Sequence, residues 1–175
     1  MVGTSSEQES AHLQTAAGTF LGQDNGEWGG QLLFQSAEKP TKPVVVKEGN
    51  IRLIFQANGH VYFIEGLAHL HRSTGTLYQI AGNAPGLTWV KLLDFEDAPE
   101  AFAVEGSTVY IAQHRGFVML RNLQQKVILE NTFWGSLYPN SVAVFSNDEV
   151  CIGLRGGYVR LNTRTRTIQF FQHMP

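Results

Sequence analysis

The sequence predicts an all-β fold made of repeated four-stranded antiparallel sheets, and three observations lead to this prediction. From Thr19 onward, short runs rich in Val, Ile, Phe, Tyr and Leu are separated every few residues by Gly, Asn, Asp or Pro, as is typical of strands and turns. This part of the chain shows no amphipathic helix of ordinary length. The same strand-and-turn pattern also recurs along the chain, which indicates a repeat architecture.

Each repeat is predicted to contain four strands, of which the second is the most alike from repeat to repeat. The turn before it contains Asn, Gly or Asp, which accept the positive φ of a tight hairpin. Three repeats are complete: their first strands are 51–55, 101–104 and 141–145, their second strands 61–64, 109–112 and 150–153, their third strands 76–80, 117–120 and 158–161, and their fourth strands 89–93, 126–129 and 167–171.

The N-terminal part fits the same frame as one further repeat that lacks its innermost strand. Thr19–Leu21, Gln31–Phe34 and Val44–Val46 correspond to the second, third and fourth strands. The third strands thus begin at residues 31, 76, 117 and 158, a spacing of 41 to 45 residues. In total the pattern accounts for fifteen strands.

Residues 1–17 differ from the rest of the chain. Ser6 to Glu9 has the form of a capping box, and residues 7–17 contain neither Pro nor Gly, so a short N-terminal helix is predicted. The alternatives are that this segment covers an open sheet edge or supplies the missing strand. We therefore divide the chain into an N-terminal segment, 1–17, and a single β domain, 18–175.

Composition narrows the class of protein. A 43% hydrophobic content excludes a disordered chain, and no apolar run is long enough to span a membrane. A net charge of −2 without a Lys/Arg cluster argues against nucleic acid as a partner. The single cysteine, Cys151, excludes an internal disulfide framework and slightly favours the cytoplasm. A processed secreted or periplasmic chain would have the same composition, so the compartment stays open.

Residues 139–144, 149–154 and 156–162, PNSVAV, EVCIGL and GGYVRLN, together resemble a blade of the β-propeller superfamily. The resemblance extends over residues 19–171 and points to no specific family. It implies a small or incomplete propeller-like array, because the chain holds about four blades. The ring would be small, open, or completed by a second chain, and a β-sandwich is the alternative architecture.

In this arrangement the loops between second and third strands share one face with the connections between repeats. In propellers of this kind that face usually binds partners. Aromatic side chains flanked by Arg and carboxylates are typical of interface hot spots. The alternative is that Trp28 and Trp134 only seal the core. The predicted binding face consists of Asp24, Glu27, Trp28, Arg72, Asp97, His114, Arg115, Trp134, Tyr138 and Arg155.

No metal, cofactor or catalytic motif is predicted. Asp24-x-Gly26 lacks the ligand series of a calcium loop and favours an ordinary Asx-type turn. His69 and His71 would point the same way on a strand, but a zinc site needs further ligands. Cys151 lies mid-strand and is interpreted as a structural core residue.

We therefore expect a non-enzymatic binding module for a protein or peptide, one version being an inhibitor or immunity-type protein of bacterial kind. One alternative is a hydrolase or lyase at the mouth of the ring, with His114 or His69/His71 as base and Asp24, Glu27 or Asp97 as its partner or as a metal ligand. The other is a half-propeller that forms a homodimer with a ligand site at the shared axis.

Overall fold

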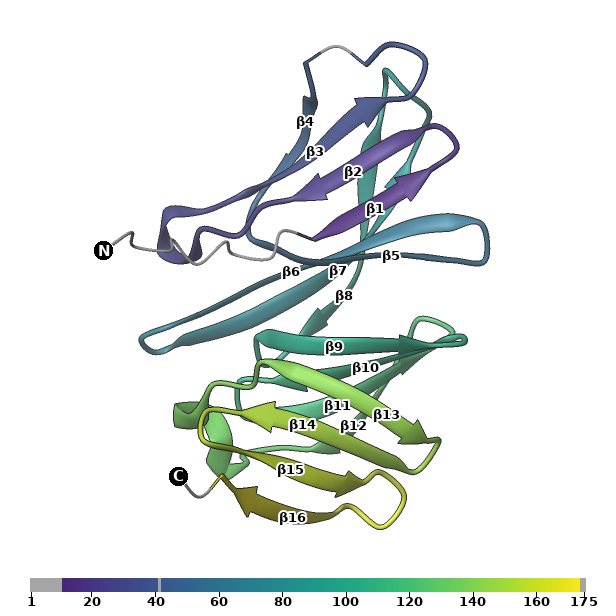
Figure 1. Ribbon diagram of the computed structural model, residues 1–175. Coiled ribbons are helices and arrows are strands. Elements are labelled where there is room, and N and C mark those ends of the chain that lie inside the picture. Colours follow the sequence, from purple (N-terminus) through teal and green to yellow (C-terminus); the bar gives the residue numbers. More distant parts are fainter. Residues whose placement is uncertain (1–10, 41, 174–175) are drawn as a thin grey trace, which may run out of the picture. The chain divides into compact units, whose positions relative to one another are not determined.

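The computed structural model describes residues 11–40 and 42–173. Within them, sixteen strands form four antiparallel sheets, each made of four strands that are consecutive in the chain (Figure 1). The strands are β1 (His12–Thr15), β2 (Gly18–Gly22), β3 (Gln31–Ser36), β4 (Val44–Glu48), β5 (Ile51–Ala57), β6 (His60–His69), β7 (Arg72–Ala81), β8 (Thr88–Phe95), β9 (Pro99–Glu105), β10 (Thr108–Gln113), β11 (Gly116–Arg121), β12 (Gln124–Leu129), β13 (Ser141–Ser146), β14 (Glu149–Leu154), β15 (Gly157–Asn162) and β16 (Thr167–Gln172), and two short 3-10 helices are η1 (Gly26–Trp28) and η2 (Phe133–Leu137).

The prediction of an N-terminal helix is wrong for the part of residues 1–17 that the structure describes. Residues 1–10 lie outside the described part, but His12–Thr15 form strand β1, which pairs antiparallel with β2. At the turn, Thr15 Oγ1 donates a hydrogen bond to the carbonyl oxygen of Gly18, 2.8 Å away. Pairing with β2 therefore overrides the local helical preference. β1 is the innermost strand that the first repeat lacked, as the alternative for this segment anticipated.

Gly18 shows why this turn needs glycine. Its φ is +152°, and a Cβ added there would lie 2.2 Å from the carbonyl oxygen of Gln35 and 2.7 Å from the ring of Phe34. Any larger residue would push β1 and β2 away from β3.

The chain divides into two compact units. Among the described residues, unit 1 comprises 11–40, 42–69 and 76–94, and unit 2 comprises 70–75 and 95–173. In unit 1, β1 and β2 contact β5, and the sheets bury one apolar cluster between them. This cluster contains Phe20, Leu32, Phe34, Ile51, Ile54, Phe63, Tyr78 and Ile80.

Unit 2 has the same design. β9 and β10 contact β13, and a second apolar cluster forms the core. Its members are Ala101, Tyr110, Ala112, Phe117, Ile128, Trp134, Val150, Ile152, Leu154, Val159 and Leu161. Four separate four-stranded sheets confirm the predicted propeller-like array and differ from the two facing sheets of a sandwich. No helix in the described part of the chain is long and apolar enough to cross a membrane.

Candidate binding face

Loops and inter-sheet connections of unit 1 are joined by backbone hydrogen bonds. The amide of Gly49, before β5, donates to the carbonyl oxygen of Gly30, and the distance is 2.9 Å. The amide of Ile51 donates to the carbonyl oxygen of Gln23 at 3.0 Å. The β2–β3 loop and the β4–β5 connection therefore share one end of unit 1, as the repeat pattern predicted.

Within that end, Asp24 has a structural role. Its Oδ1 accepts a hydrogen bond from the amide of Gly26 at 3.0 Å, which is an Asx-type turn. Its Oδ2 lies 2.9 Å from Nη1 of Arg52 in an ion pair. The buried side chain of Asn50 adds a hydrogen bond from Nδ2 to the carbonyl oxygen of Gly26 at 2.6 Å. The polar residues of this loop thus hold the loop itself.

Trp28 and Glu27 reach the surface of unit 1. Trp28 is 84% exposed, although it lies in the ordered turn η1. Glu27 Oε2 lies 3.1 Å from Nε2 of His69, at the end of β6. His71 is in the following turn rather than on the strand with His69, so the two histidines do not share a strand face. Among the described residues, no group of three or more His, Cys, Asp or Glu could hold a metal ion.

In unit 2 the corresponding segments are also hydrogen-bonded. The amide of Thr132 donates to the carbonyl oxygen of Arg115 at 2.8 Å. The amide of Arg155 donates to the carbonyl oxygen of Leu137 at 2.6 Å. The β12–β13 connection, which contains η2, is therefore fixed to both the β10–β11 and the β14–β15 loop.

Asp97 joins three segments of unit 2. Its Oδ1 accepts a hydrogen bond from Ser73 Oγ, and its Oδ2 accepts one from the amide of Arg115 at 2.5 Å. Ser73 Oγ in turn accepts from the amide of Ala98 at 3.0 Å. Arg72, next to Ser73, is exposed. Asp97 therefore has a structural role in joining these segments, whereas the side chain of Arg72 is exposed.

Trp134 does not belong to the surface, which corrects the prediction. Its side chain is fully buried, and its Nε1 donates a hydrogen bond to the carbonyl oxygen of Gln113 at 3.2 Å. The indole fills an apolar core, and a backbone acceptor satisfies its single donor, so burial leaves no polar group of this side chain without a partner. The alternative that Trp134 seals the core is correct for this residue, whereas Trp28 stays exposed.

Four exposed side chains gather around η2, and we call them the η2 patch: Arg115, Phe133, Tyr138 and Arg155. The guanidinium carbon of Arg155 lies 4.6 Å from the ring centroid of Tyr138. Phe133 is 52% exposed, and its ring centroid is 5.9 Å from that of Trp134. A Cβ added at Gly135 would lie 3.0 Å from Cγ of Arg115, so Arg115 packs against η2. Phe133 was missing from the predicted face. Its position next to Trp134, on a connection between two strands, could have indicated that it belongs there.

His114 lies beside this patch and contacts a carboxylate. Its Nδ1 is 3.4 Å from Oε1 of Glu100, yet that buried nitrogen has no hydrogen bond with acceptable geometry. The long contact therefore counts as an electrostatic proximity and not as a formed hydrogen bond. The enzyme alternative did not name Glu100 as a carboxylate. Among the described residues, the contact of His69 with Glu27 is one that it did name.

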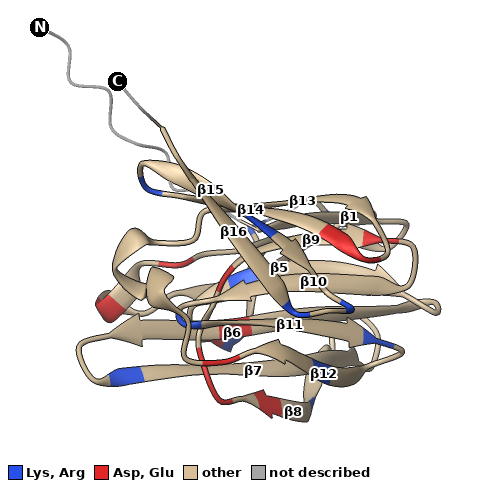
Figure 2. Cartoon of the chain, turned by 90° about the horizontal axis from the view of Figure 1, so that it is seen from below, with Lys and Arg blue, Asp and Glu red and all other residues tan. Residues whose placement is uncertain are grey.

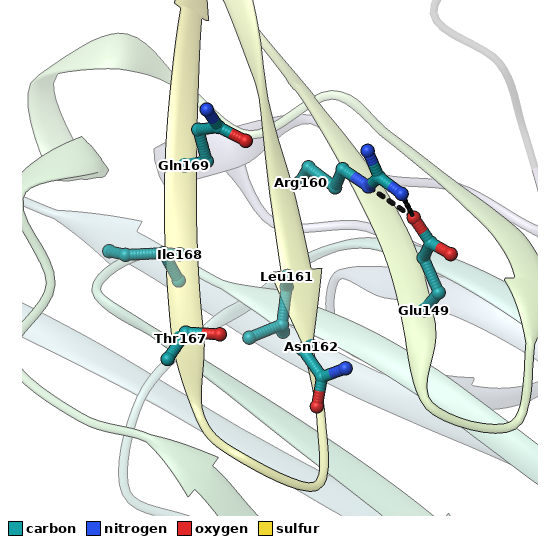
Figure 3. Close-up of a pocket in the computed structure, with 7 residues that line it drawn as sticks. All are labelled: Glu149, Arg160, Leu161, Asn162, Thr167, Ile168 and Gln169. Carbon is teal, nitrogen blue, oxygen red and sulfur yellow. Dashed lines mark hydrogen bonds and ion pairs between the residues drawn. The ribbon is translucent and has the colours of Figure 1, made fainter.

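A pocket of about 470 Å³ lies at a different place, on strands β14, β15 and β16 of the last sheet. Figure 3 shows Arg160 of β15 pointing toward Glu149 of β14, with which it forms an ion pair (Figure 3). Elsewhere, in the view of Figure 2, basic and acidic residues are interspersed along strands and turns.

Comparison with known proteins gives a fold and no family. No family model matches the sequence, and no curated protein matches it. A chain from a nidogen/laminin complex shares 12% identity over 89% of this chain and 59% of its own, with a TM-score of 0.54. A chain from an S. cerevisiae complex of Dbp5 with Nup159 and Gle1 shares 10% identity over 92% of this chain and 46% of its own, with a TM-score of 0.54.

The computationally designed Ika4 protein shares 11% identity with this chain, covering 97% of it and 94% of Ika4, with a TM-score of 0.51. Identities this low show the fold alone. The protein is a β-propeller-like array of four sheets, and it spans less than two thirds of the length of the first two structures.

Proposed function

We propose that this protein is a binding module that recognises a protein or peptide partner through the η2 patch of unit 2. The observation that supports this most strongly is the state of Tyr138, whose ring is 55% exposed and yet packed against Arg155. Exposed aromatic side chains beside arginines are the residues that dominate interface binding energy.

The backbone beneath the patch favours tight recognition. The hydrogen bonds of Arg115 with Thr132 and of Arg155 with Leu137 fix both sides of η2, and the buried Trp134 anchors its centre. Because these segments are held before a partner arrives, little conformational entropy is lost on binding. An inhibitor or immunity-type protein, with the patch covering the cleft of an enzyme, is one specific version of this proposal.

Site-specific photo-crosslinking tests the location of the contact. A photo-reactive phenylalanine analogue at position 138 should crosslink to a protein partner when whole cells are irradiated. The matched control has the same analogue at Val104, which is 46% exposed on β9 and lies at the opposite end of its strand from the loops. Crosslinks from position 104 but not from 138 would contradict the proposal.

Affinity measurements with the crosslinked partner then test the energetics. Tyr138→Ala and Arg155→Ala should each weaken binding by about tenfold or more, as hot-spot truncations do. Val104→Ala should leave the affinity unchanged. If both patch variants bind as tightly as the natural chain, the η2 patch is not the binding surface.

A further inference from the structure

The outermost strands of the four sheets, β4, β8, β12 and β16, differ in their charged residues. β4 contains Lys47 and Glu48, β8 contains Lys91 and Asp94, and β12 contains Lys126. β16 has the sequence TIQFFQ and contains no charged residue. Charged side chains, lysine above all, are a common means by which proteins keep an exposed strand edge from pairing with another chain. β16 lacks this protection.

The outer edge of β16 is open. In the described part of the chain, β16 pairs with β15 and with no other strand (Figure 1). Most of its residues are exposed, among them Ile168 at 39% and Phe170 at 40%. A strand edge that is exposed, apolar and uncharged is a template on which another extended chain can pair.

Strand register shows which backbone groups of β16 face this edge. The amide of His173 donates to the carbonyl oxygen of Gly156 at 2.8 Å, and the same register continues along β15 and β16. In an antiparallel pair, residues that exchange hydrogen bonds alternate with residues that do not. Ile168, Phe170 and Gln172 therefore direct their amide and carbonyl groups away from β15, toward the open edge. A row of donors and acceptors at this spacing matches the backbone of another extended chain.

The C-terminal part of β16 lies beside the η2 patch. The ring centroid of Phe170 is 5.6 Å from that of Phe133, a member of the patch. The hydrogen bond of His173 with Gly156 joins the end of β16 to the β14–β15 loop, which also contains Arg155. A chain that paired with β16 along its length would therefore reach the η2 patch at one end.

We propose that the partner supplies an extended segment that adds to β16 as a fifth strand and reaches the η2 patch at one end. This inference rests on the proposed function of the patch and names the form in which the partner binds. In strand addition, main-chain hydrogen bonds supply affinity, and side chains at alternate positions supply specificity. A segment of about six residues covers β16, which is itself six residues long.

The residues of β16 define the chemistry of this segment. Every second side chain of the added strand would lie beside Ile168 or Phe170 on the same side of the sheet, so these positions should be apolar. Because β16 has no charge to offer, the paired part of the segment should be uncharged, since a charge there would lose water without gaining a partner. At the end near the patch, the exposed side chains of Arg115 and Arg155 favour a carboxylate.

Selection from a displayed library of random peptides, with the full chain as target, is the first test. Enriched peptides should alternate apolar with other residues and carry Asp or Glu toward one end. Each backbone amide of one enriched peptide is then methylated in turn. In an added strand only every second N–H faces β16, so binding should be lost at alternate positions. The absence of enriched peptides, or a loss at all positions or at none, would overturn the proposal.

Variants at position 168 test the edge from the side of the protein. Ile168→Pro removes an N–H that faces the open edge and leaves the pairing with β15 in place, as prolines in edge strands do, so it should weaken peptide binding at least about tenfold. Ile168→Ala is the matched control: it shortens the side chain but keeps the N–H, so binding should weaken clearly less. Far-UV circular dichroism checks folding. Should Ile168→Pro not fold, Ile168→Lys replaces it, because it adds a charge of the kind that the other outermost strands contain.

Tyr138→Ala distinguishes this inference from the proposed function. If Tyr138→Ala weakens binding of the enriched peptides and the Pro and Lys variants of Ile168 do not, the η2 patch is the binding surface and the added strand is refuted. If only the variants of Ile168 weaken binding, the peptides add to β16 but the η2 patch is not their binding surface. Weaker binding in both sets supports both proposals, and unchanged binding in both sets overturns both.

Discussion

The guanidinium of Arg155 stacks on Tyr138, 4.6 Å from the ring centroid, across two segments that are also joined by the backbone. The Arg155 amide donates to the carbonyl oxygen of Leu137, the residue before Tyr138. Tyr138 itself has a φ of +49°, a conformation that few non-glycine residues adopt. The side-chain contact and the backbone bond together direct the phenol ring to the surface of the η2 patch.

The first prediction concerns the strength of this pair. Tyr138→Ala and Arg155→Ala should each lower the free energy of unfolding by about 1 kcal/mol or less, because cation–π contacts at exposed sites are weak. In a double-mutant cycle measured by chemical denaturation, their coupling should be about 0.5–1 kcal/mol. Arg155→Lys, which keeps the charge without the planar guanidinium, should retain only part of it. A coupling of zero would show that the stacking does not persist in solution.

Trp134 leads to the opposite prediction, a large loss of stability. Replacing the fully buried indole by Ala should cost about 3–5 kcal/mol, because it leaves a cavity in the core of unit 2. Trp134→Phe should cost clearly less, since it keeps most of the apolar contacts and loses the hydrogen bond to Gln113. Urea denaturation monitored by circular dichroism measures both. A surface-like effect of Trp134→Ala, below about 1 kcal/mol, would contradict the buried position.

The next prediction is that Asp97 keeps the β10–β11 loop ordered rather than contacting a partner directly. Asp97→Ala removes the acceptor of Ser73 Oγ and of the Arg115 amide, and leaving donors unsatisfied costs about 1–3 kcal/mol. Because Asp97 is only half-buried, we expect the lower end of this range. Limited proteolysis should then cut the β10–β11 loop faster. Asp97→Asn keeps one acceptor oxygen, so its rate of cleavage should be intermediate. Equal protease resistance of all three proteins would be evidence against this structural role of Asp97.

The repeated strands could be predicted because each one encodes its own turn and its own alternation. Val150, Ile152 and Leu154 alternate with less buried residues along β14, and this local period of two is visible in the sequence. β1 was only an alternative to the predicted helix, because its alternation covers only four residues, from His12 to Thr15. Its conformation is decided by pairing with β2, which is a nonlocal interaction.

The candidate site was predicted less completely, for a related reason. The sequence correctly placed Arg115, Tyr138 and Arg155 on loops, because Gly-containing turns flank two of these residues. It could not separate Phe133 from Trp134, which are adjacent in the sequence. Which of the two rings enters the core depends on the 3-10 turn of η2 and on the acceptor that Gln113 supplies, and both come from tertiary structure.

The last prediction concerns the pH dependence of the thiol of Cys151. Burial raises its pKa above the ordinary value, neighbouring Glu149 raises it further, and nearby Arg160 lowers it. The thiolate is the reactive form, so iodoacetamide should alkylate Cys151 slowly at neutral pH. The midpoint of its pH–rate profile should lie higher in the folded protein than in urea. Because the pKa is raised on folding, the stabilising contribution is complete below the ordinary thiol pKa and is lost as pH rises through the folded pKa.

Two variants separate the electrostatic causes from simple lack of access. Glu149→Gln should move the midpoint of the Cys151 profile to lower pH, because it removes a negative neighbour, and Arg160→Gln should move it to higher pH, because it removes a positive one. A change in access alone would scale the rates at every pH and leave the midpoint in place. Opposite shifts of the two midpoints therefore verify that Cys151 lies between these charges on β14 and β15, and coinciding midpoints would refute it.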